Sequence, residues 1–154
     1  MSALPPEEHP ASEAWRLVVV AGVRLELPGV HPEVILHEAV APWRELRIPV
    51  GFAEGTAIAY AWQGLSTPRP LTHALMNDLL AMHDVVVEAM RITERHGRVF
   101  YAELETMGPR GRKVIECRPS DGLALVLRKR LPTPVLVADG VFDDPVVTAP
   151  GSPR

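Results

Sequence analysis

The sequence has 154 residues, a formal net charge of −3 and a single cysteine, and 47% of its residues are hydrophobic. These values indicate one globular domain in a reducing compartment, and they exclude a disulfide-stapled fold and a strongly basic domain that coats nucleic acid. The charge is uneven, with a net −5 over residues 1–84 and a net +4 over residues 85–133, which leaves room for a local basic face in the second half. No apolar run is long enough to span a bilayer and the first residues lack a signal-peptide pattern, so we expect a cytoplasmic protein with no membrane partner.

Strand patterns dominate the first third of the chain. Runs of β-branched and apolar residues predict strands within residues 16–27, 33–40 and 44–50. The stretch AEGTAIAYAWQ at 53–63 predicts a short buried helix, and STPRP at 66–70 predicts a turn. The first half therefore reads as three strands followed by a helix.

A second helix is predicted over residues 71–83. Its pattern is amphipathic and puts Leu71, Leu75, Leu79 and Met82 on one face. This helix has no counterpart in the second half of the chain.

The second half repeats the order of three strands and a helix. Strands are predicted within residues 84–93, 98–106 and 112–117, and a short strand within 134–138 follows the helix. The helix opens with the stretch RPSDG at 118–122.

This helix start contains one residue that helix formation does not explain. Ser120 is expected to be the N-cap, and Asp121 lies where the positive end of the helix dipole favours a carboxylate. Arg128 and the two basic residues after it, Lys129 and Arg130, are expected to close the helix at its negative end. Arg118, in contrast, puts a cation at the positive end.

The two halves match at a constant offset of 67 residues. The valines of 18–20 meet those of 85–87, and Glu54 with its following glycine meets Asp121 with its following glycine. We therefore predict an α+β fold with an internal duplication of two βββα units, over residues 17–64 and 84–131, in which helices pack on antiparallel or mixed sheets.

These units form one predicted domain over residues 15–144, between tails of low apolar content at 1–14 and 145–154 that we expect to be disordered. A repeat fold of this kind leaves strand edges that need cover, so we expect a homo-oligomer, with a dimer favoured.

Two motifs carry a resemblance to a known family. PRPLTH at 68–73 and RPSDG-LAL at 118–125 resemble the bifunctional nuclease family, and IPVGFAEGTAIAYAWQG, FYAEL and PVLVADGVFD extend the similarity over about residues 16–143. The resemblance implies hydrolysis of phosphodiester bonds in DNA and RNA, with nucleic acid as the partner. The family usually carries an aspartate directly after the first motif, where this chain has Ala74, and a small residue other than glycine where this chain has Gly122.

Phosphodiester hydrolysis needs an activated water and stabilisation of charge on the phosphoryl oxygens. The catalytic candidates are Glu54, His73 and Asp121, and Asp78 is a further carboxylate in the same region. Carboxylates of this kind can also hold Mg²⁺ or Mn²⁺, but the sequence contains no compact ligand motif, so the cofactor stays open.

Substrate binding is assigned to the cations and hydroxyls of the two motifs, Arg69 and Thr72 in the first and Arg118 and Ser120 in the second. Arg69 lies between two prolines, which present its side chain at a defined angle. Thr72 also has the type of a helix N-cap.

The same residues admit a structural interpretation. Both arginines can pair with a carboxylate that links the two halves, and a lone histidine at a helix start is commonly solvated or capping. Ala74 and the acidic net charge favour an alternative function, a non-catalytic binding or regulatory module that keeps the nuclease-family fold. The two hypotheses differ in whether the charged groups converge on an open cleft or on a closed ion-pair core.

Overall fold

The computed structural model describes residues 14–128 and 132–142. Almost all of the two predicted tails, together with Lys129 and Arg130, therefore lies outside the described residues. The elements, in chain order, are β1 (Trp15–Arg24), β2 (Glu33–Glu38), β3 (Glu45–Pro49), α1 (Phe52–Trp62), α2 (Thr72–Met82), β4 (Val86–His96), β5 (Val99–Gly108), β6 (Gly111–Cys117), α3 (Pro119–Val126), β7 (Val135–Ala138) and the single 3₁₀ turn η1 (Asp139–Val141).

All seven strands form one mixed sheet in the order β3-β2-β1-β7-β4-β5-β6. Each trio, β1 to β3 and β4 to β6, is an antiparallel meander. The short strand β7 lies between the trios, antiparallel to β1 and parallel to β4. The predicted α+β class and the mixed sheet are confirmed.

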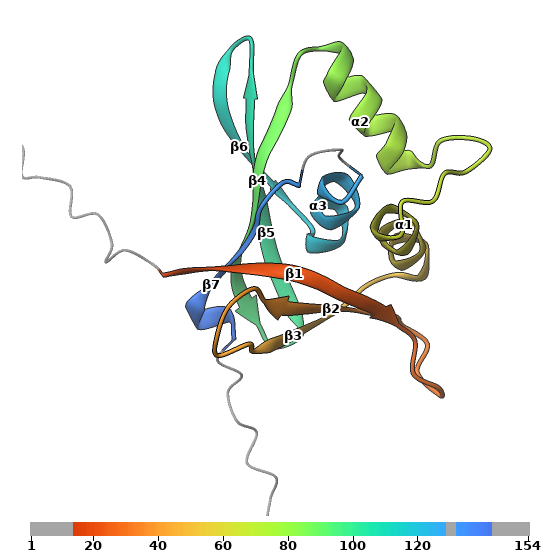
Figure 1. Ribbon diagram of the computed structural model, residues 1–154, viewed down its shortest axis with the longest axis vertical. Helices are drawn as coiled ribbons and strands as arrows, with labels where there is room; N and C mark the ends of the chain where they lie inside the picture. The colour runs from red at the N-terminus through yellow and green to blue at the C-terminus, as the bar shows by residue number, and fades with distance from the viewer. Residues whose placement is uncertain (1–13, 129–131, 143–154) are drawn as a thin grey trace, which may run out of the picture.

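The sheet is strongly twisted, as right-handed strand twist accumulates across seven strands. In Figure 1, β1 to β3 run nearly across the view and β4 to β6 nearly along it, while α1, α2 and α3 gather on one side. The hairpin between β4 and β5 turns at Gly97 and that between β5 and β6 at Gly111, which both have a positive φ that favours glycine.

The pairing register bears on the predicted duplication. Val20 pairs with Leu36 and Val87 with Thr106, so the partners in the first strands differ by 67 positions and those in the middle strands by 70. Both first strands shift register at matching places, between Val20 and Gly22 and between Val87 and Ala89.

An ungapped offset of 67 is therefore wrong for the middle strand. The chain runs 16 residues from Val20 to its partner Leu36 and 19 residues from Val87 to its partner Thr106, so the second path is three residues longer. The path from Leu36 to Leu46 takes ten residues and that from Thr106 to Lys113 takes seven, which restores the offset of 67 in the third strands. The match of Glu38 with Glu105 at that offset is not a match of sheet positions. The duplication itself stays a prediction.

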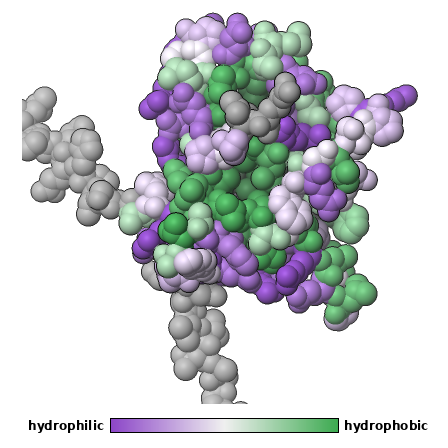
Figure 2. All heavy atoms as spheres, viewed as in Figure 1, coloured by the Kyte–Doolittle hydropathy of each residue, from purple (hydrophilic) through white to green (hydrophobic). Residues whose placement is uncertain are grey.

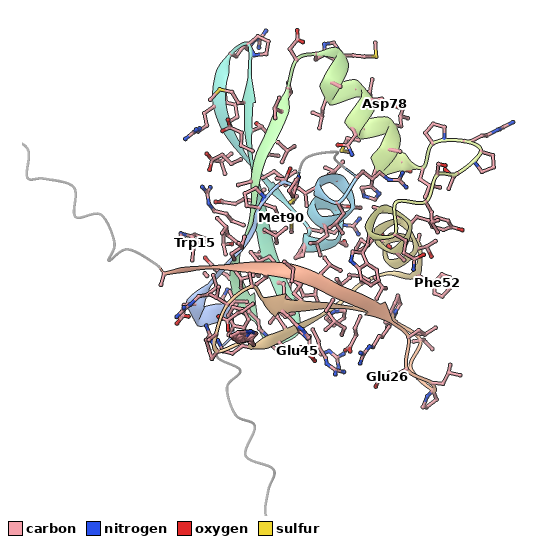
Figure 3. The ribbon with its side chains drawn as sticks, viewed as in Figure 1. Trp15, Glu26, Glu45, Phe52, Asp78 and Met90 are labelled. Carbon is pink, nitrogen blue, oxygen red and sulfur yellow. The ribbon has the colours of Figure 1, made fainter. Side chains whose placement is uncertain are left out.

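The core lies between the sheet and the helices. Apolar residues of β2, β3, β4 and β7 meet those of α1 and α3, and the most deeply buried side chains are Val34, Leu36, Ile58, Met90, Ile92, Leu123, Ala124 and Val137. Figure 3 shows Met90 near the centre of the molecule, beside α3. Figure 2 shows the surface of the same face, where a green apolar area in the middle is surrounded by purple polar residues.

Hydrogen bonds through Arg44 link the buried carboxylate of Glu38, at the end of β2, to Asp139 of η1. Glu38, with a side chain only 1% exposed, accepts hydrogen bonds from the backbone N–H and the guanidinium of Arg44. Arg44 also donates to Asp139 over 2.7 Å, and Asp139 accepts from Arg16. These hydrogen bonds hold the pKa of Glu38 below its ordinary value, although burial opposes the shift.

The predicted leucine face of α2 does not form its buried side. Leu75, Leu79 and Met82 are 51%, 48% and 75% exposed, and His73 is the buried residue of the helix. Asn77, one turn later, donates from Nδ2 to the Leu125 carbonyl of α3 over 3.1 Å. The helix therefore contacts α3 through polar groups that hydrophobic periodicity does not report, while Leu71 and Leu80 pack half-buried against the core.

Two predicted N-caps are also wrong. The N-cap of α3 is Arg118, since Pro119 takes the first helical position that its fixed φ suits, and Ser120 is buried in the first turn. The N-cap of α2 is Leu71, so Thr72 is already helical. At the other end, α3 stops at Val126, before Arg128 could close it.

Candidate catalytic and anion-binding site

His73 of α2 and Asp121 of α3 form a hydrogen-bonded pair. The two helices run side by side, and His73 Nε2 lies 2.9 Å from Asp121 Oδ1. The side chains are 11% and 29% exposed, so the pair is half-buried. Because Asp121 can only accept when it is ionised, Nε2 carries the proton and Nδ1 is the basic nitrogen of the neutral ring.

Arg118 holds the same carboxylate from the solvent side. Its Nε lies 2.7 Å from Asp121 Oδ2 and its Nη2 lies 3.0 Å from Oδ1, which is a bidentate contact. Its Nη2 also lies 3.3 Å from Glu54 Oε1, so one guanidinium links the first turns of α1 and α3. The Arg118 side chain is 65% exposed, and these contacts leave Nη1 free to face a ligand.

Glu54 occupies its place because the residue before its helix is a glycine. A Cβ at Gly51, the N-cap of α1, would collide with the Glu54 carboxylate. Gly55 and Gly122, which follow Glu54 and Asp121, lie close to other side chains. A Cβ at Gly55 would lie 2.8 Å from Pro32 Cγ, and one at Gly122 would lie 2.9 Å from the side chain of Met90. The rigid Pro32 ring therefore favours glycine at position 55, whereas the Met90 side chain would have to shift to admit a Cβ at position 122.

The electrostatics of the site keep Asp121 charged. Burial raises the pKa of the Asp121 carboxyl, but the hydrogen bonds from Arg118 and His73 outweigh it, so the pKa lies below its ordinary value. The contacts with Asp121 correspondingly raise the pKa of Arg118. Cys117 next door is no nucleophile, because burial and the charge of Asp121 raise the pKa of its thiol to about 11.

A cleft of about 400 Å³ opens beside Arg118. The starts of both helices, at Gly51 and at Pro119–Ser120, line it, as do the apolar side chains of Ile48, Pro49, Val50, Val99 and Phe100. Its basic side chains are Arg118 and Arg98, and the imidazole of His31 also lines it. The two helix starts and the guanidinium of Arg98 favour an anion in the cleft, while Arg118 is shared with the carboxylates of Asp121 and Glu54.

The predicted site residues are only partly brought together. Glu54, His73, Asp121 and Arg118 form one cluster, and Ser120 lines the adjacent cleft. Asp78 lies elsewhere, in a second pocket.

The remaining two residues of the first motif stay outside the cluster. Arg69 is exposed in the loop before α2, where its carbonyl accepts a hydrogen bond from the Thr67 hydroxyl. Thr72 is exposed at the start of α2. Within the described part of the chain, neither residue shares an ion pair or hydrogen bond with the cluster. Their assignment to substrate binding stays a prediction.

Sequence reasoning missed His31 and Arg98. His31 lies in the β1–β2 connection and Arg98 in the β4–β5 hairpin. Neither belongs to a motif, and only the folding of the sheet brings them to the two helix starts.

The cluster does not fit a divalent metal in this arrangement. Both oxygens of Asp121 are engaged by Arg118 and His73. Within residues 14–128 and 132–142, no three histidine, cysteine, aspartate or glutamate side chains are grouped so that they could hold a metal ion. A metal at the carboxylates would have to displace Arg118, so no step is derived through one. Among the helices of the described residues, none is long and apolar enough to cross a membrane.

Comparison with known proteins adds a family match. The family model of the bifunctional nuclease domain matches residues 34–149. Two uncharacterized proteins of Mycobacterium tuberculosis, MT1877 of strain CDC 1551 / Oshkosh and Rv1829 of strain ATCC 25618 / H37Rv, are each 41% identical over 115 residues. The aligned region covers 75% of this chain and 68% of each relative.

Proposed function

Because the chain belongs to the bifunctional nuclease domain family, we propose that it hydrolyses phosphodiester bonds of nucleic acid where α1 and α3 begin. The observation that carries the proposal is the contact of Arg118 with both Asp121 and Glu54 at the mouth of the cationic cleft. Asp121 also forms the half-buried hydrogen-bonded pair with His73, on the other side from Arg118.

The groups have separate roles in the proposed reaction. A phosphodiester binds in the cleft, where the free Nη1 of Arg118 and the side chains of Arg98 and His31 attract its oxygens. Asp121 accepts from Nε2 of His73, which fixes the tautomer and leaves Nδ1 to take a proton from water. The water oxygen attacks the phosphorus while the P–O bond to the leaving oxygen breaks. The Asp121 carboxylate stabilises the positive charge on the ring until the ring returns its proton to the leaving oxygen.

Arg118 is the group whose contacts change most when phosphate binds. It neutralises the two carboxylates in the free protein, and a phosphate that binds through Nη1 weakens the longer of its contacts, the 3.3 Å contact of Nη2 with Glu54. Phosphate binding therefore frees Glu54 to accept a proton or to orient water. Ser120 adds a hydroxyl at the wall of the cleft.

A cleavage assay tests the proposal. The protein is incubated with end-labelled single-stranded DNA and RNA, with Mg²⁺, with Mn²⁺ and with a chelator. Arg118→Ala is expected to lower cleavage at least tenfold with little loss of stability, because the side chain is 65% exposed. Arg110→Ala, which removes an exposed arginine from the β5–β6 turn, is the matched control and should cleave normally. Equal activity of both variants would exclude this site.

A non-catalytic binding module is the second candidate. The observation that favours it is the complete engagement of Asp121, together with the absence of a three-ligand metal group among the described residues. This candidate predicts that oligonucleotides bind and stay intact, with affinity still dependent on Arg118. Binding without cleavage under every metal condition would select it.

Three further predictions belong with this proposal. The first is that the two βββα units descend from one duplicated unit, and the matching register shifts near Gly22 and Ala89 support it.

The second is that the protein forms a homo-oligomer, most simply a dimer, and the exposed apolar side chains of α2 support that view. Light scattering that finds only monomer at micromolar concentration would oppose it. A cytoplasmic location stays an expectation from the sequence.

A further inference from the structure

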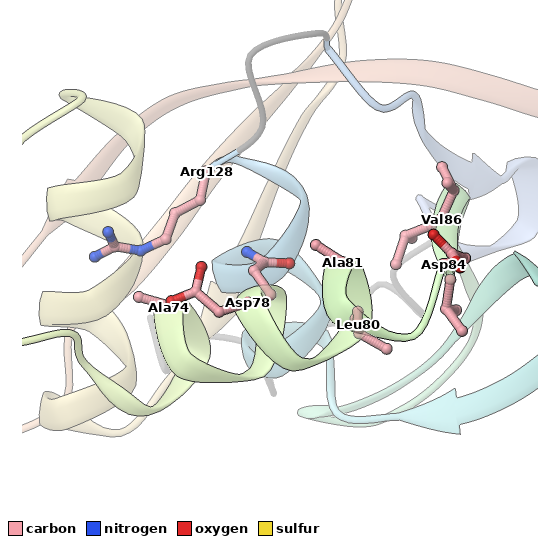
Figure 4. A pocket seen from close by; sticks show the side chains of 10 residues that line it. Ala74, Asp78, Leu80, Ala81, Asp84, Val86 and Arg128 are labelled. Carbon is pink, nitrogen blue, oxygen red and sulfur yellow. The ribbon is translucent and has the colours of Figure 1, made fainter.

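Two hydrogen bonds, one helical turn apart, join α2 to α3. Nε2 of His73 lies 2.9 Å from Oδ1 of Asp121, and Nδ2 of Asn77 donates to the Leu125 carbonyl over 3.1 Å. The two donors are four residues apart in α2 and the two acceptors are four residues apart in α3. The helices therefore run in the same direction at this contact, and both bonds form only at one register. Figure 4 shows α2 lying in front of α3.

Apolar packing holds the rotation of α2 only weakly. Leu75, Leu79 and Met82 are exposed, although their spacing would suit an inner face. Leu71, just before the helix, and Leu80, near its end, pack half-buried against the core. Because so little apolar surface is covered, the polar contacts with α3 decide which side of α2 faces the cluster.

The amide of Asn77 suits the group that it contacts. Leu125 lies in the last turn of α3, which ends at Val126, and carbonyl groups at a helix end lack a donor from within the helix. A carbonyl only accepts, so the side chain must present its NH₂ group. An aspartate at position 77 would have the same shape but would place a charged oxygen against the carbonyl oxygen.

We propose that Asn77 is a positioning residue that holds α2 on α3 so that the imidazole of His73 stays on Asp121. Asn77 is not among the residues that line the cleft beside Arg118, so it acts through His73 and not on a phosphate directly. A small rotation of α2 would separate Nε2 from Oδ1, because a contact lengthened to about 3.6 Å is no longer a hydrogen bond.

The effect of Asn77 on cleavage rests on the proposed function, whereas the position of the imidazole can be measured without substrate. A displacement of about 1 Å in a catalytic group can cost on the order of a hundredfold in rate. The loss of one hydrogen bond between the helices leaves part of the population in place, so we expect a cleavage rate lowered by about tenfold or more.

Proton exchange at His73, followed by NMR of the full chain, tests the positioning role. The Nε2–H signal, identified by its loss in His73→Gln, should exchange slowly with water because it lies in a half-buried hydrogen bond. Asn77→Asp and Asn77→Ala both remove the donor and should speed this exchange by about tenfold or more. Asn77→Gln keeps an amide donor and should restore part of the protection.

Met76→Asp is the matched control. It adds the same charge at the neighbouring exposed position of α2 and should leave the exchange of the His73 proton unchanged. Asn77→Ala adds no charge, so it keeps the test decisive if Asn77→Asp does not fold.

Cleavage of single-stranded oligonucleotides by the same variants separates the two proposals. Asn77→Ala should lower kcat and leave KM nearly unchanged, because the cleft beside Arg118 is intact. Faster exchange in a protein that cleaves nothing would keep the positioning role and reject the proposed function. Unchanged exchange in Asn77→Ala would overturn the positioning role, whether or not cleavage falls.

Discussion

Asp121→Asn separates a catalytic role for the cluster from a structural one. The substitution keeps the size of the side chain and leaves Oδ1 able to accept from His73 Nε2 over the present 2.9 Å. It removes the charge that Arg118 holds over 2.7 and 3.0 Å. The geometry of the imidazole is therefore retained, while the stabilisation of a protonated ring is lost.

The expected loss of stability is moderate. A hydrogen bond to a charged group contributes about 1.5–3 kcal/mol, but Arg118 is mostly solvent-exposed and such pairs contribute about 0–1 kcal/mol. We expect the free energy of unfolding to fall by about 1–2 kcal/mol. For a domain of this length that lowers the melting temperature by roughly 2–8 °C.

The pH dependence of this difference has a defined sign. The pKa of Asp121 is lowered in the folded protein, so its charge contributes stability above the ordinary aspartate pKa of 3.8, and that contribution is lost as the pH falls through the lowered value. The stability difference between wild type and Asp121→Asn should therefore be constant near neutral pH and vanish in strong acid. Urea titrations at several pH values measure it.

The expected loss of activity is larger than the loss of stability. General acid–base catalysis contributes about 10²–10⁴-fold, so cleavage at a temperature where both proteins are folded should fall by about a hundredfold or more. Glu116→Gln, the same chemical change on the exposed side of β6, is the control and should keep full activity. His73→Gln should cost about as much as Asp121→Asn, and the double variant little more, because the two residues act as a unit.

Two results would refute this reasoning. If Asp121→Asn unfolds more easily by about 3 kcal/mol or more and loses activity only in proportion to its unfolded fraction, the pair is a structural ion pair. If it is stable and cleaves normally, the site is elsewhere.

Other parts of the structure give three further predictions. Arg98→Ala should weaken oligonucleotide binding and make it less sensitive to salt without changing the melting temperature, because the side chain lines the cationic cleft; fluorescence anisotropy at several salt concentrations checks this. Glu38→Gln should lower the free energy of unfolding by about 1.5–3 kcal/mol, because it removes the buried charge that Arg44 contacts while Arg44 keeps its contact with Asp139, as chemical denaturation would measure. Gly122→Val should cost about 1–3 kcal/mol by displacing the buried side chain of Met90, and a melt that matches wild type would show that the core adapts there.

The sequence predicts the elements of this fold well because their signals are local. A strand of β-branched residues, a glycine turn and an apolar helix can each be recognised within a few consecutive residues. Every predicted strand overlaps an observed one. The match at offset 67 likewise agrees with the places of Glu54 and Asp121, each the third residue of its helix. The different offset of the middle strands, 70 residues in place of 67, could not be seen in the sequence, because Glu38 and Glu105 match by chance at the offset of 67.

The errors arise where tertiary contacts override local pattern. Hydrophobic spacing points to Leu75 and Leu79 as the inner face of α2, but the hydrogen bonds of His73 and Asn77 to α3 turn the helix the other way. Arg128 has the position of a helix-closing residue, but α3 ends at Val126, and the Nε and Nη2 atoms of Arg128 are buried without a hydrogen-bond partner among the described residues. Neither outcome follows from the spacing of residues along the chain.

The placement of β7 has a consequence for biosynthesis. Arg16 and its partner Asp139 are 123 positions apart, and β7 is the strand that pairs with both β1 and β4. A ribosome that has delivered the chain only as far as α3 presents two separate meanders with unpaired edges at β1 and β4. These edges attract other nascent strands until residues 135–138 emerge. The last strand of the described residues is thus the one that joins the two halves of the sheet, so the halves can unite only after nearly the whole described chain is available.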